Sequence, residues 1–575
     1  MVFSGSCAGP LGASAHSTGD REEPTVNERP GAVLEQQTGA GAGPGLGWRP
    51  TTAPAAFAPD DIADIIGYVR HPVHVVRETA TGMLGLALGG ELVGAGESEL
   101  SLVGTLPPIY PEWLGDREFC EAHGVRFPYV TGAMANGIAT PALVIAMAEA
   151  GMMGFFGAGG LSYDAVERGL DEIQTALAGR PGLAWGANLI HSPNEVSLET
   201  RVAELFIARG VPVVEASAFM KLTPAVVHYA LSGLDTDPAG NIVRRNHVMA
   251  KVSRPEVARM FIEPAPAALV SALVSAGKLT EREAELSRYV PVAEDITVES
   301  DSGGHTDNRP LPALFSEIAM LRDSLAQQHA LNCRVRVGAA GGLGAPQAVA
   351  GAFAMGAAYV LTGSVNQACV ESGLSAPGRA MLATAGIADV MMAPASDMFE
   401  MGVNLQVLKR GTMFAPRGKK LYEWYAGNPD LASVVAKHGP ELEKILGTTV
   451  AEVWADTQRY WQQRDPAVLE LASRDPKYQM ALVFRWYLGQ SSRWAISGIP
   501  ERVLDYQIWC GPAMGAFNSW VAGSHLEPCE NRQAVQVALN LLEGAAQVTR
   551  ASAARSCGVP VPAKAFAYSP RPLAV

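Results

Sequence analysis

The 575-residue chain has few cysteines, and they form no recognisable metal or disulfide pattern. The seven cysteines are scattered, their number is odd, and no two stand in a Cys-x-x-Cys pair. This spacing argues against a zinc knuckle and against a disulfide framework. His71 and His74 come nearest to a ligand pair, but they match no metal signature, so a structural role is preferred. We therefore expect a reduced, cytoplasmic protein without a metal site.

Positive charge is also scarce. The 44 Lys and Arg residues are outnumbered by 57 Asp and Glu residues, which gives a formal net charge of −13. A nucleic-acid surface needs clustered basic side chains that displace counterions, so no nucleic-acid partner is expected. The chain begins without a basic segment followed by an apolar one, so no secretory signal is recognised. A charge-free run at residues 337–370 is broken by glycines and Pro346, which predicts strand, helix and strand rather than a membrane span.

Three common catalytic motifs are missing, namely the GxxxxGK[ST] phosphate loop, the GxSxG nucleophile elbow and the HExxH zinc motif. The chain is nevertheless long and apolar enough for a substantial core, since 48% of its residues are hydrophobic and 18% are charged. Any chemistry must therefore be sought in the way the strands and helices are arranged.

Composition divides the chain into four parts. Residues 1–55 are rich in Gly, Ala, Pro, Thr and Glu without apolar periodicity, which predicts a disordered tail. Residues 56–120 carry short mixed segments and predict a small N-terminal module. Strands and helices alternate regularly over 121–420. Residues 421–575 hold most of the tryptophans and longer helical stretches, and predict a helical C-terminal region packed on the preceding domain.

The alternation over 121–420 predicts an α/β fold, a (β/α)8 TIM barrel. Near-continuous apolar strands between amphipathic helices indicate a parallel sheet, and eight such strands favour closure into a barrel. The predicted strands are Phe127–Thr131, Met153–Phe156, Leu183–Asn188, Val211–Glu215, His247–Val252, Ile296–Glu299, Val335–Ala339 and Tyr359–Thr362. The predicted helices are Pro141–Ala150, Tyr163–Ala178, Leu198–Arg209, Pro224–Leu231, Arg254–Phe261, Leu311–Gln327 and Pro346–Met355, with an eighth expected after Gly363.

One insertion interrupts this rhythm. Residues 263–291 precede the sixth strand and carry a predicted helix of their own, Ala267–Arg288. Insertions on the loops that follow strands lie at the catalytic face of a barrel, so this segment is expected to form a lid or a substrate platform.

The carboxyl ends of the strands, where a barrel assembles its active site, are rich in small residues. Such ends let a flat cofactor approach the backbone. Gly341 and Gly342 follow the seventh strand, and Gly363 and Ser364 follow the eighth, so their amides are predicted to bind a phosphate. The alternative is that these glycines only form tight turns. Two such pairs after the last two strands favour the phosphate site, and with it a flavin.

Two titratable residues stand out at strand ends. His305 follows Ser-Gly-Gly in a predicted loop, where barrels keep catalytic groups, so a catalytic or substrate-contacting role is expected. Lys251 ends the fifth strand, where a buried cation needs an anionic partner. A reduced flavin would be such a partner, and a salt bridge with Glu215 or Glu299 is the alternative.

Several motifs resemble one known family of FMN barrels. The stretches Gly132–Ala135, Trp185–Leu189, Glu299–His305, Ala339–Gly342 and Leu361–Gly363 resemble the 2-nitropropane dioxygenase-like enzymes. Within that group the chain is most similar to the trans-acting enoyl reductases of polyunsaturated fatty acid and polyketide synthases. The discriminating stretches are Gly104–Gly115, Pro394–Gly402 and Asp505–Asn518, and the resemblance covers residues from about Ala63 to about Gln547.

The resemblance implies FMN at the barrel mouth, with NADPH as the reductant. A hydride then passes to the β-carbon of a 2-enoyl group on an acyl carrier protein, and the α-carbon is protonated. His305 falls on the family's active-site histidine, and Lys251 is implied beside it. The cofactor-binding residues implied are Gly132, Ala133, Met134, Asn188, Glu215, Lys251, Gly304, Gly341, Gly342, Gly363 and Ser364.

The main alternative function is that of a nitronate monooxygenase, which would share every FMN contact and differ in substrate. The helical bulk outside the barrel favours the enoyl reductase, because a small nitronate needs no such surface. Carrier proteins are acidic, so a basic patch is expected near the barrel mouth, with Arg254, Lys278, Arg282 and Arg288 as candidates. The oligomeric state stays open, with a homodimer as one alternative.

Overall fold

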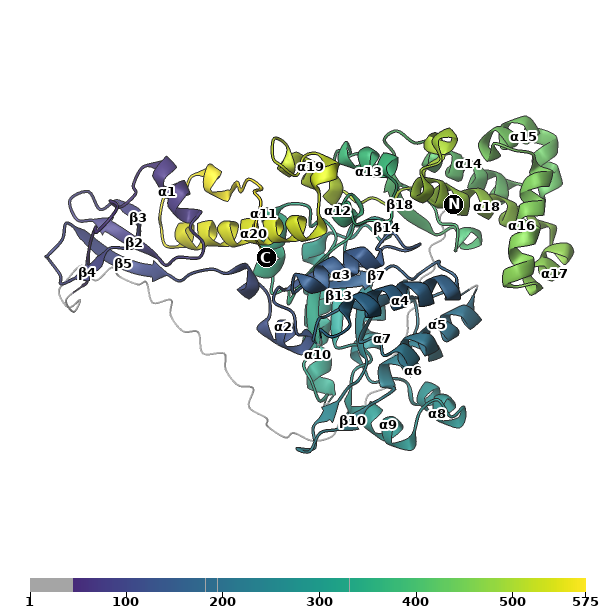
Figure 1. Cartoon of the computed structure of the whole chain (residues 1–575), viewed down its shortest axis with the longest axis horizontal. Coiled ribbons are helices and arrows are strands. Elements are labelled where there is room, and N and C mark those ends of the chain that lie inside the picture. Colours follow the sequence, from purple (N-terminus) through teal and green to yellow (C-terminus); the bar gives the residue numbers. More distant parts are fainter. Residues whose placement is uncertain (1–44, 181, 194, 330, 575) are drawn as a thin grey trace, which may run out of the picture. The chain divides into compact units, whose positions relative to one another are not determined.

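The computed structural model describes residues 45–180, 182–193, 195–329 and 331–574 (Figure 1). Most of the predicted tail therefore lies outside the described residues. Its last part is folded, however, because β1 (Gly47–Arg49) pairs with β4 (Glu91–Val93) and β5 (Leu100–Leu106). Trp48 is fully buried there, and its Nε1 donates to the Gly89 carbonyl at 2.7 Å. The boundary predicted at residue 55 is thus wrong, because the ordered module already includes β1.

The N-terminal module is an antiparallel sheet in the order β3-β2-β5-β1-β4, with β2 at Val73–Glu78 and β3 at Leu84–Leu88. The helix α1 (Pro59–Ile66) buries Ile62 and Ile66 in a cluster that also contains residues of the C-terminal helix α20 (Ala534–Ser556). His74 lies on β2, where its Nδ1 is 2.8 Å from the Thr105 hydroxyl, so it has a structural partner.

The predicted eight-stranded barrel is confirmed. The strands are parallel and close in the order β12-β13-β15-β16-β6-β7-β8-β9. They are β6 (Tyr129–Thr131), β7 (Met153–Phe156), β8 (Gly186–Ile190), β9 (Val213–Ser217), β12 (His247–Val252), β13 (Asp295–Glu299), β15 (Arg336–Ala340) and β16 (Val360–Thr362). All eight overlap the strands predicted from apolar runs.

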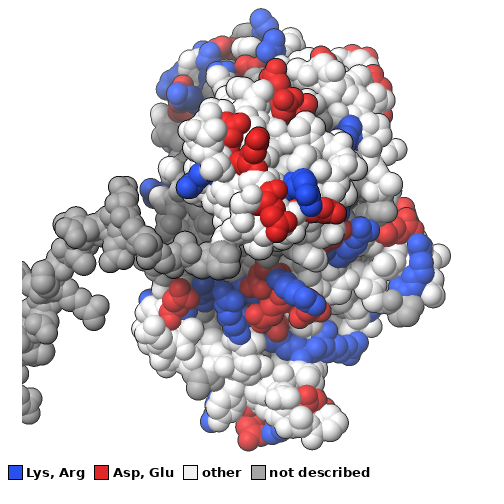
Figure 2. All heavy atoms as spheres, turned by 90° about the vertical axis from the view of Figure 1, so that its left-hand side faces the viewer, with Lys and Arg blue, Asp and Glu red and all other residues white. Residues whose placement is uncertain are grey.

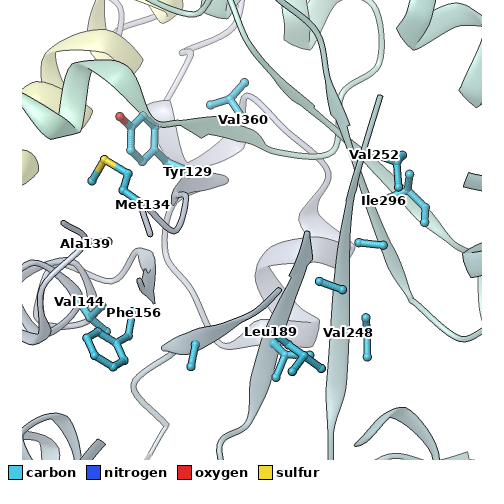
Figure 3. Close-up of a cluster of buried hydrophobic side chains, with 14 of the residues drawn as sticks. Tyr129, Met134, Ala139, Val144, Phe156, Leu189, Val248, Val252, Ile296 and Val360 are labelled. Atoms are coloured by element: carbon cyan, nitrogen blue, oxygen red, sulfur yellow. The ribbon is translucent and has the colours of Figure 1, made fainter. Parts of the chain in front are cut away.

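Alternation along these strands separates an outer from an inner core. Leu189, Val248 and Ile296 pack in the layer between strands and helices, as Figure 3 shows. Their neighbours in sequence point to the barrel axis, where Met249 and Tyr359 are fully buried. Side chains two residues apart on a strand share a face, so Lys251 projects inward like Met249, at the carboxyl end.

Seven helices follow the first seven strands, again close to the predicted positions. Several begin at a hydroxyl residue whose side chain accepts from the backbone amide three positions later, such as Thr140, Ser162 and Thr223. The helices are α3 (Pro141–Glu149), α4 (Tyr163–Leu177), α5 (Val196–Arg209), α6 (Pro224–Leu231), α7 (Pro255–Ile262), α10 (Leu311–Gln328) and α11 (Pro346–Ala354).

The eighth barrel helix comes from an unexpected place. The helix that directly follows β16 is α12 (Ser364–Gln367), which is only four residues long. The helix α20 instead packs along α11 and also touches α3, so it takes the position between the seventh and first helices (Figure 1). The predicted division at residue 420 is therefore corrected, because residues 368–533 form an insertion between the eighth strand and its helix.

This large insertion belongs to the loops at the carboxyl end of the strands. It contains β17 (Val390–Pro394) and β18 (Asn404–Leu408), which form a small sheet with β14 (Gly304–His305). Its helices are α13 (Ala376–Ala383), α14 (Phe414–Gly427), α15 (Leu431–Leu446), α16 (Val450–Arg464), α17 (Ala467–Arg474), α18 (Pro476–Ser497) and α19 (Ala513–Val521). The helix α18 is the central one, since α14, α15, α16 and α17 all pack on it.

The smaller insertion at 263–291 is not a lid. It forms two helices rather than one, α8 (Ala267–Ser275) and α9 (Glu281–Leu286), because the chain breaks at Gly277 with φ of +68° and restarts at a capping box on Thr280. It follows a helix and precedes a strand, so it lies at the amino ends of the strands, beside α6 and β10 (Asp235–Thr236) (Figure 1). That is the end opposite to the catalytic face.

No single helix of the described chain is long and apolar enough to cross a membrane. The helices α7 and α8 meet the length and composition criteria only as a pair bent by 53°. Of these, α7 packs on α10 and on β12 as a helix of the barrel.

A buried ion cluster closes the amino end of the barrel. Asp295 accepts hydrogen bonds from Arg336 at 2.7 and 2.8 Å, and its other neighbour is His123 Nε2 at 2.8 Å. All three side chains are at most 5% exposed. Burial alone would raise the pKa of Asp295, but the charges and hydrogen bonds of His123 and Arg336 hold it well below its usual range.

Candidate active site

A cavity of about 340 Å³ opens at the carboxyl ends of the strands. Residues that end or follow each of the eight strands line it, and the insertion supplies the rest of the wall, including Asp397, Trp461 and Arg485. The predicted residues that line it together are Gly132, Ala133, Met134, Asn188, Lys251, Gly304, His305, Gly341, Gly342, Gly363 and Ser364. The fold thus brings into one cavity segments that are far apart in sequence.

The glycine corner after β15 and β16 has room for an anion. Gly342 and Gly363 have open space where a Cβ would stand, with no atom within 4 Å. In the described part of the chain, the amides of Gly342, Gly363 and Ser364 have no hydrogen-bond acceptor. Gly341 and Gly342 adopt φ values of +86° and +70°, which favour glycine. Unpaired N–H groups around open space fit a phosphate, as the sequence predicts.

Charged residues form the floor of the cavity. Lys251 Nζ lies 3.3 Å from Glu299 Oε1, so one of the two predicted ion pairs is present. Burial alone would lower the pKa of Lys251, but Glu299 and Glu215 outweigh it and raise the pKa, so the ammonium stays charged. A fixed cation therefore stands at the inner end of the cavity.

Glu215 lies beneath this floor rather than in the cavity wall. It is fully buried, and its Oε2 accepts from the Ala133 amide at 2.9 Å. Its Oε1 has no hydrogen-bond partner among the described residues. Burial raises the pKa of Glu215, against the opposing effect of Lys251 and the Ala133 amide. Glu215 therefore does not line the cavity, unlike the other implied cofactor-binding residues, and it reaches the cavity wall through its hydrogen bond to the Ala133 backbone.

His305 is held on a strand and not in a loop, because β14 pairs with β18 through His305 and Leu405. Its Nε2 lies 3.3 Å from Asp397 Oδ1, and its side chain is 32% exposed. Burial would lower the pKa of His305, but Asp397 outweighs this effect and raises it. His305 therefore keeps its proton to a higher pH than a free histidine.

Sequence reasoning did not select Asp397, although a signal was present. Asp397 lies within the stretch Pro394–Gly402 that separates this branch of the resemblance from simpler relatives. Its pKa is lowered, because the contact with His305 outweighs burial. Arg485 of α18 stands nearby in the wall and donates to Glu400 at 3.1 Å.

One side of the cavity lies between a barrel helix and the insertion. Leu198 and Val202 stand on the same face of α5 as Glu195, at helical spacing, and all three line the cavity with Trp461 of α16. One turn beyond Trp461, Arg464 Nη2 contacts Glu195 Oε2 at 3.0 Å. The ion pair ties the insertion to the barrel beside an apolar part of the wall.

Two wall residues other than glycine adopt left-handed backbone conformations. Asn136 has a φ of 57° and Ala218 a φ of 61°. Asn136 Nδ2 donates to the Ser492 hydroxyl of α18 at 3.2 Å, which holds its conformation in place. Strain of this kind is concentrated at functional sites, and here both positions lie in the cavity wall.

The predicted basic patch at the barrel mouth is absent from the expected residues. Lys278, Arg282 and Arg288 belong to the insertion at the amino end of the barrel. Lys278 pairs with Glu204 at 2.5 Å and Arg282 with Glu285 at 2.8 Å. Arg254 does lie at the carboxyl end, but Asp307 binds its guanidinium at 2.8 and 2.9 Å. On another face of the molecule, the left-hand side of Figure 1, basic and acidic side chains are interspersed (Figure 2).

Fold and cavity together define an α/β barrel with its site at the carboxyl ends of the strands. The chain belongs to the nitronate monooxygenase family, whose model matches residues 118–417. A second model, the inserted helical domain of [acyl-carrier-protein] S-malonyltransferase, matches residues 430–506. That match covers α15 to α18, the helices of the large insertion.

Similar proteins come from two biosynthetic systems. Over 451 residues the chain is 48% identical to a polyunsaturated fatty acid synthase subunit of Thraustochytrium sp., covering 77% of this chain and 30% of that protein. It is 41% identical over 435 residues to the polyketide biosynthesis protein PksE of Bacillus subtilis, covering 76% of this chain and 56% of that protein. The chain spans less than two thirds of the length of either relative.

A solved structure matches more completely. The enoyl reductase domain of MlnA, from the macrolactin biosynthesis cluster of Bacillus amyloliquefaciens, is 35% identical with a TM-score of 0.72. The match covers 77% of this chain and 98% of that domain. The similarity therefore extends beyond the barrel into the surrounding helices.

Proposed function

We propose that the chain is an FMN-dependent, trans-acting enoyl reductase. It reduces the 2,3 double bond of enoyl-acyl carrier protein thioesters with NADPH, in polyketide or polyunsaturated fatty acid biosynthesis. The observation that carries the proposal is one cavity with unpaired amides after the last two strands, a buried cation and a histidine–carboxylate pair. The relatives in fatty acid and polyketide biosynthesis, and the enoyl reductase domain among them, support the substrate class.

The cavity residues fit FMN. Its phosphate would be held by Gly341, Gly342, Gly363 and Ser364, where the chain offers free amides and open space. Its ring would lie among Gly132, Ala133, Met134, Asn188, Lys251 and Gly304, which are mostly small or polar. When bound, FMN supplies hydride transfer between NADPH and the substrate. Lys251 would place a fixed positive charge beside the ring.

His305 and Asp397 would act on the thioester. The raised pKa of His305 favours the protonated imidazole, which is a hydrogen-bond donor at both ring nitrogens. A donor of this kind stabilises the negative charge that develops on the thioester oxygen when the β-carbon accepts a hydride. Asp397 orients the imidazole through its contact with Nε2, which leaves Nδ1 for the substrate.

A nitronate monooxygenase is the second candidate, because the matching family bears that name. The insertion at 368–533 favours the enoyl reductase. It encloses the cavity mouth and adds an apolar side between α5 and α16, which an acyl chain on a carrier arm would need and a small nitronate would not.

Two parallel assays separate the candidates. The flavin-loaded protein is given crotonyl-acyl carrier protein with NADPH, and a nitronate with oxygen. We expect saturated butyryl-carrier protein from the first assay and little oxidation in the second. Rapid nitronate oxidation without enoyl reduction would assign the chain to the monooxygenase.

A further inference from the structure

A second histidine–carboxylate pair lies in the cavity wall, and no step described so far uses it. We propose that His191, oriented by Glu199, is the general acid that delivers the proton to the α-carbon of the enoyl group. This inference rests on the proposed function and adds the proton donor to it.

The backbone fixes His191 at the rim of the barrel. It follows the last residue of β8, and its amide donates to the Ser217 carbonyl at the end of β9, at 3.0 Å. Its ring stacks on Phe219, with ring centroids 5.3 Å apart and an interplanar angle of 21°. The residue is 8% exposed and lines the cavity.

Glu199 holds the ring through its Nδ1. Glu199 Oε2 lies 3.0 Å from His191 Nδ1 and accepts from the Ser192 amide at 2.8 Å. Glu199 Oε1 accepts from the Thr223 hydroxyl at 2.5 Å. Burial would raise the pKa of Glu199, but the hydrogen bonds from His191, Thr223 and Ser192 outweigh it and lower the pKa. Glu199 is therefore an anion that accepts an N–H from His191 Nδ1.

The other ring nitrogen, Nε2, is available for proton transfer. Among the described residues, the hydrogen bond of the His191 ring is made by Nδ1, to Glu199, and Nε2 makes none. A carboxylate that binds Nδ1–H selects the tautomer and stabilises the imidazolium, which is the arrangement of a catalytic acid or base. His305 differs, since the nitrogen that lies near its carboxylate is Nε2, 3.3 Å from Asp397 Oδ1. The two histidines therefore suit different tasks, charge stabilisation for His305 and proton transfer for His191.

The step balances in atoms and electrons. A hydride that originates from NADPH adds to the β-carbon, and the π electrons of the 2,3 double bond form a new C–H bond at the α-carbon with the proton from His191 Nε2. The neutral His191 is then reprotonated from water. In sum, NADPH, the enoyl thioester and one proton yield NADP⁺ and the saturated thioester.

The test separates the two half-reactions in a stopped-flow instrument. Flavin-loaded His191→Gln and Glu199→Gln are compared with wild type and with His228→Gln, a control histidine of α6 that does not line the cavity. We expect reduction by NADPH to stay within about twofold in all four proteins. Reoxidation by crotonyl-carrier protein should slow by about 10²- to 10⁴-fold in His191→Gln and be unchanged in the control.

The pH dependence gives a readout that a structural role would not produce. Loss of the Glu199 charge removes the anion that faces Nδ1, so the pH profile of the reoxidation rate should change in Glu199→Gln and stay that of wild type in His228→Gln. The other charged groups of the cavity wall all belong to pairs with an opposite charge. These pairs are Glu195 with Arg464, Lys251 with Glu299, His305 with Asp397, and Arg485 with Glu400. None of them is altered in this variant.

A measurement without substrate completes the test. Nitrogen NMR shifts of the His191 ring should report the Nδ1–H tautomer at high pH, even if His191→Gln fails to fold. The Nε2–H tautomer, or normal reoxidation in a folded His191→Gln, would overturn the inference while leaving the reductase intact. Absence of enoyl reduction in wild type would instead refute the proposed function.

Discussion

The glycine corner allows a flavin-binding test that leaves the apoprotein unaffected. Gly363 has a φ of −127° and open space around its Cβ position, so Gly363→Val needs no left-handed backbone and meets no neighbouring atom. The valine would instead fill the space assigned to the FMN phosphate. Hydrogen bonds to a charged group each contribute about 1.5–3 kcal/mol. Loss of two should therefore weaken FMN binding by roughly 10²- to 10⁴-fold.

Two further glycines serve as comparisons for this variant. Gly342→Val should also lose FMN, but its φ of +70° costs a side chain about 1–2 kcal/mol, so the apoprotein should melt lower as well. Gly351 lies exposed on α11 with open space around it, so Gly351→Val should keep FMN and change stability by less than about 0.5 kcal/mol.

The assay combines FMN titration by fluorescence with thermal melting of the stripped protein. Of the three variants, we expect only Gly363→Val to combine weak FMN binding with a normal melting temperature. Full FMN occupancy in Gly363→Val would show that the phosphate lies elsewhere. Equal loss of FMN in Gly351→Val would show that the effect is not local.

Three other predictions test the remaining parts of the account. His305→Ala should retain FMN yet turn over crotonyl-carrier protein about 10²- to 10³-fold more slowly, the loss expected for a donor that stabilises developing negative charge, so normal turnover would remove its assigned role. Ala218→Gly should raise stability by about 1 kcal/mol in a denaturant titration, because it relieves a φ of 61°, whereas a lower stability would contradict the strain. Asp295→Asn should destabilise the fold by about 3–5 kcal/mol, because it leaves Arg336 and His123 buried without their anion. The pKa of Asp295 is depressed in the folded state, so its contribution to the free energy of unfolding is present above the unfolded-state pKa of about 4 and is lost as the pH falls below that value. Melting temperatures of wild type and Asp295→Asn, measured over an acid titration, would check this loss.

The barrel strands were predictable because each is a short apolar run that ends in small residues. The position of the eighth barrel helix was not predictable. The sequence of α20 indicates a helix but does not say where that helix packs, and only the three-dimensional contacts place it between α11 and α3. The position of the insertion at 263–291, in contrast, could have been predicted from the sequence. Its position after α7 and before β13 puts it at the amino ends of the strands, so chain order alone contradicts a lid.

Some residues of the candidate site could likewise be predicted from the sequence, and others could not. His305 and the glycine pairs could be placed at the cavity from the sequence because they follow predicted strands. Glu215 also ends a predicted strand, but alternation turns its side chain to the barrel axis below the cavity, so a strand end alone does not make a cavity residue. Asp397 reaches the site from the large insertion, and the order of residues along the chain does not reveal that contact.

The most direct test of enoyl reduction is a single anaerobic turnover. The protein is loaded with FMN, reduced with one equivalent of NADPH, and mixed with crotonyl-carrier protein in the absence of oxygen. We expect the oxidised flavin absorbance to return while an equal amount of butyryl-carrier protein forms, as measured by mass spectrometry of the carrier. A flavin that stays reduced until oxygen or a nitronate is added, with the crotonyl group unchanged, would contradict enoyl reduction.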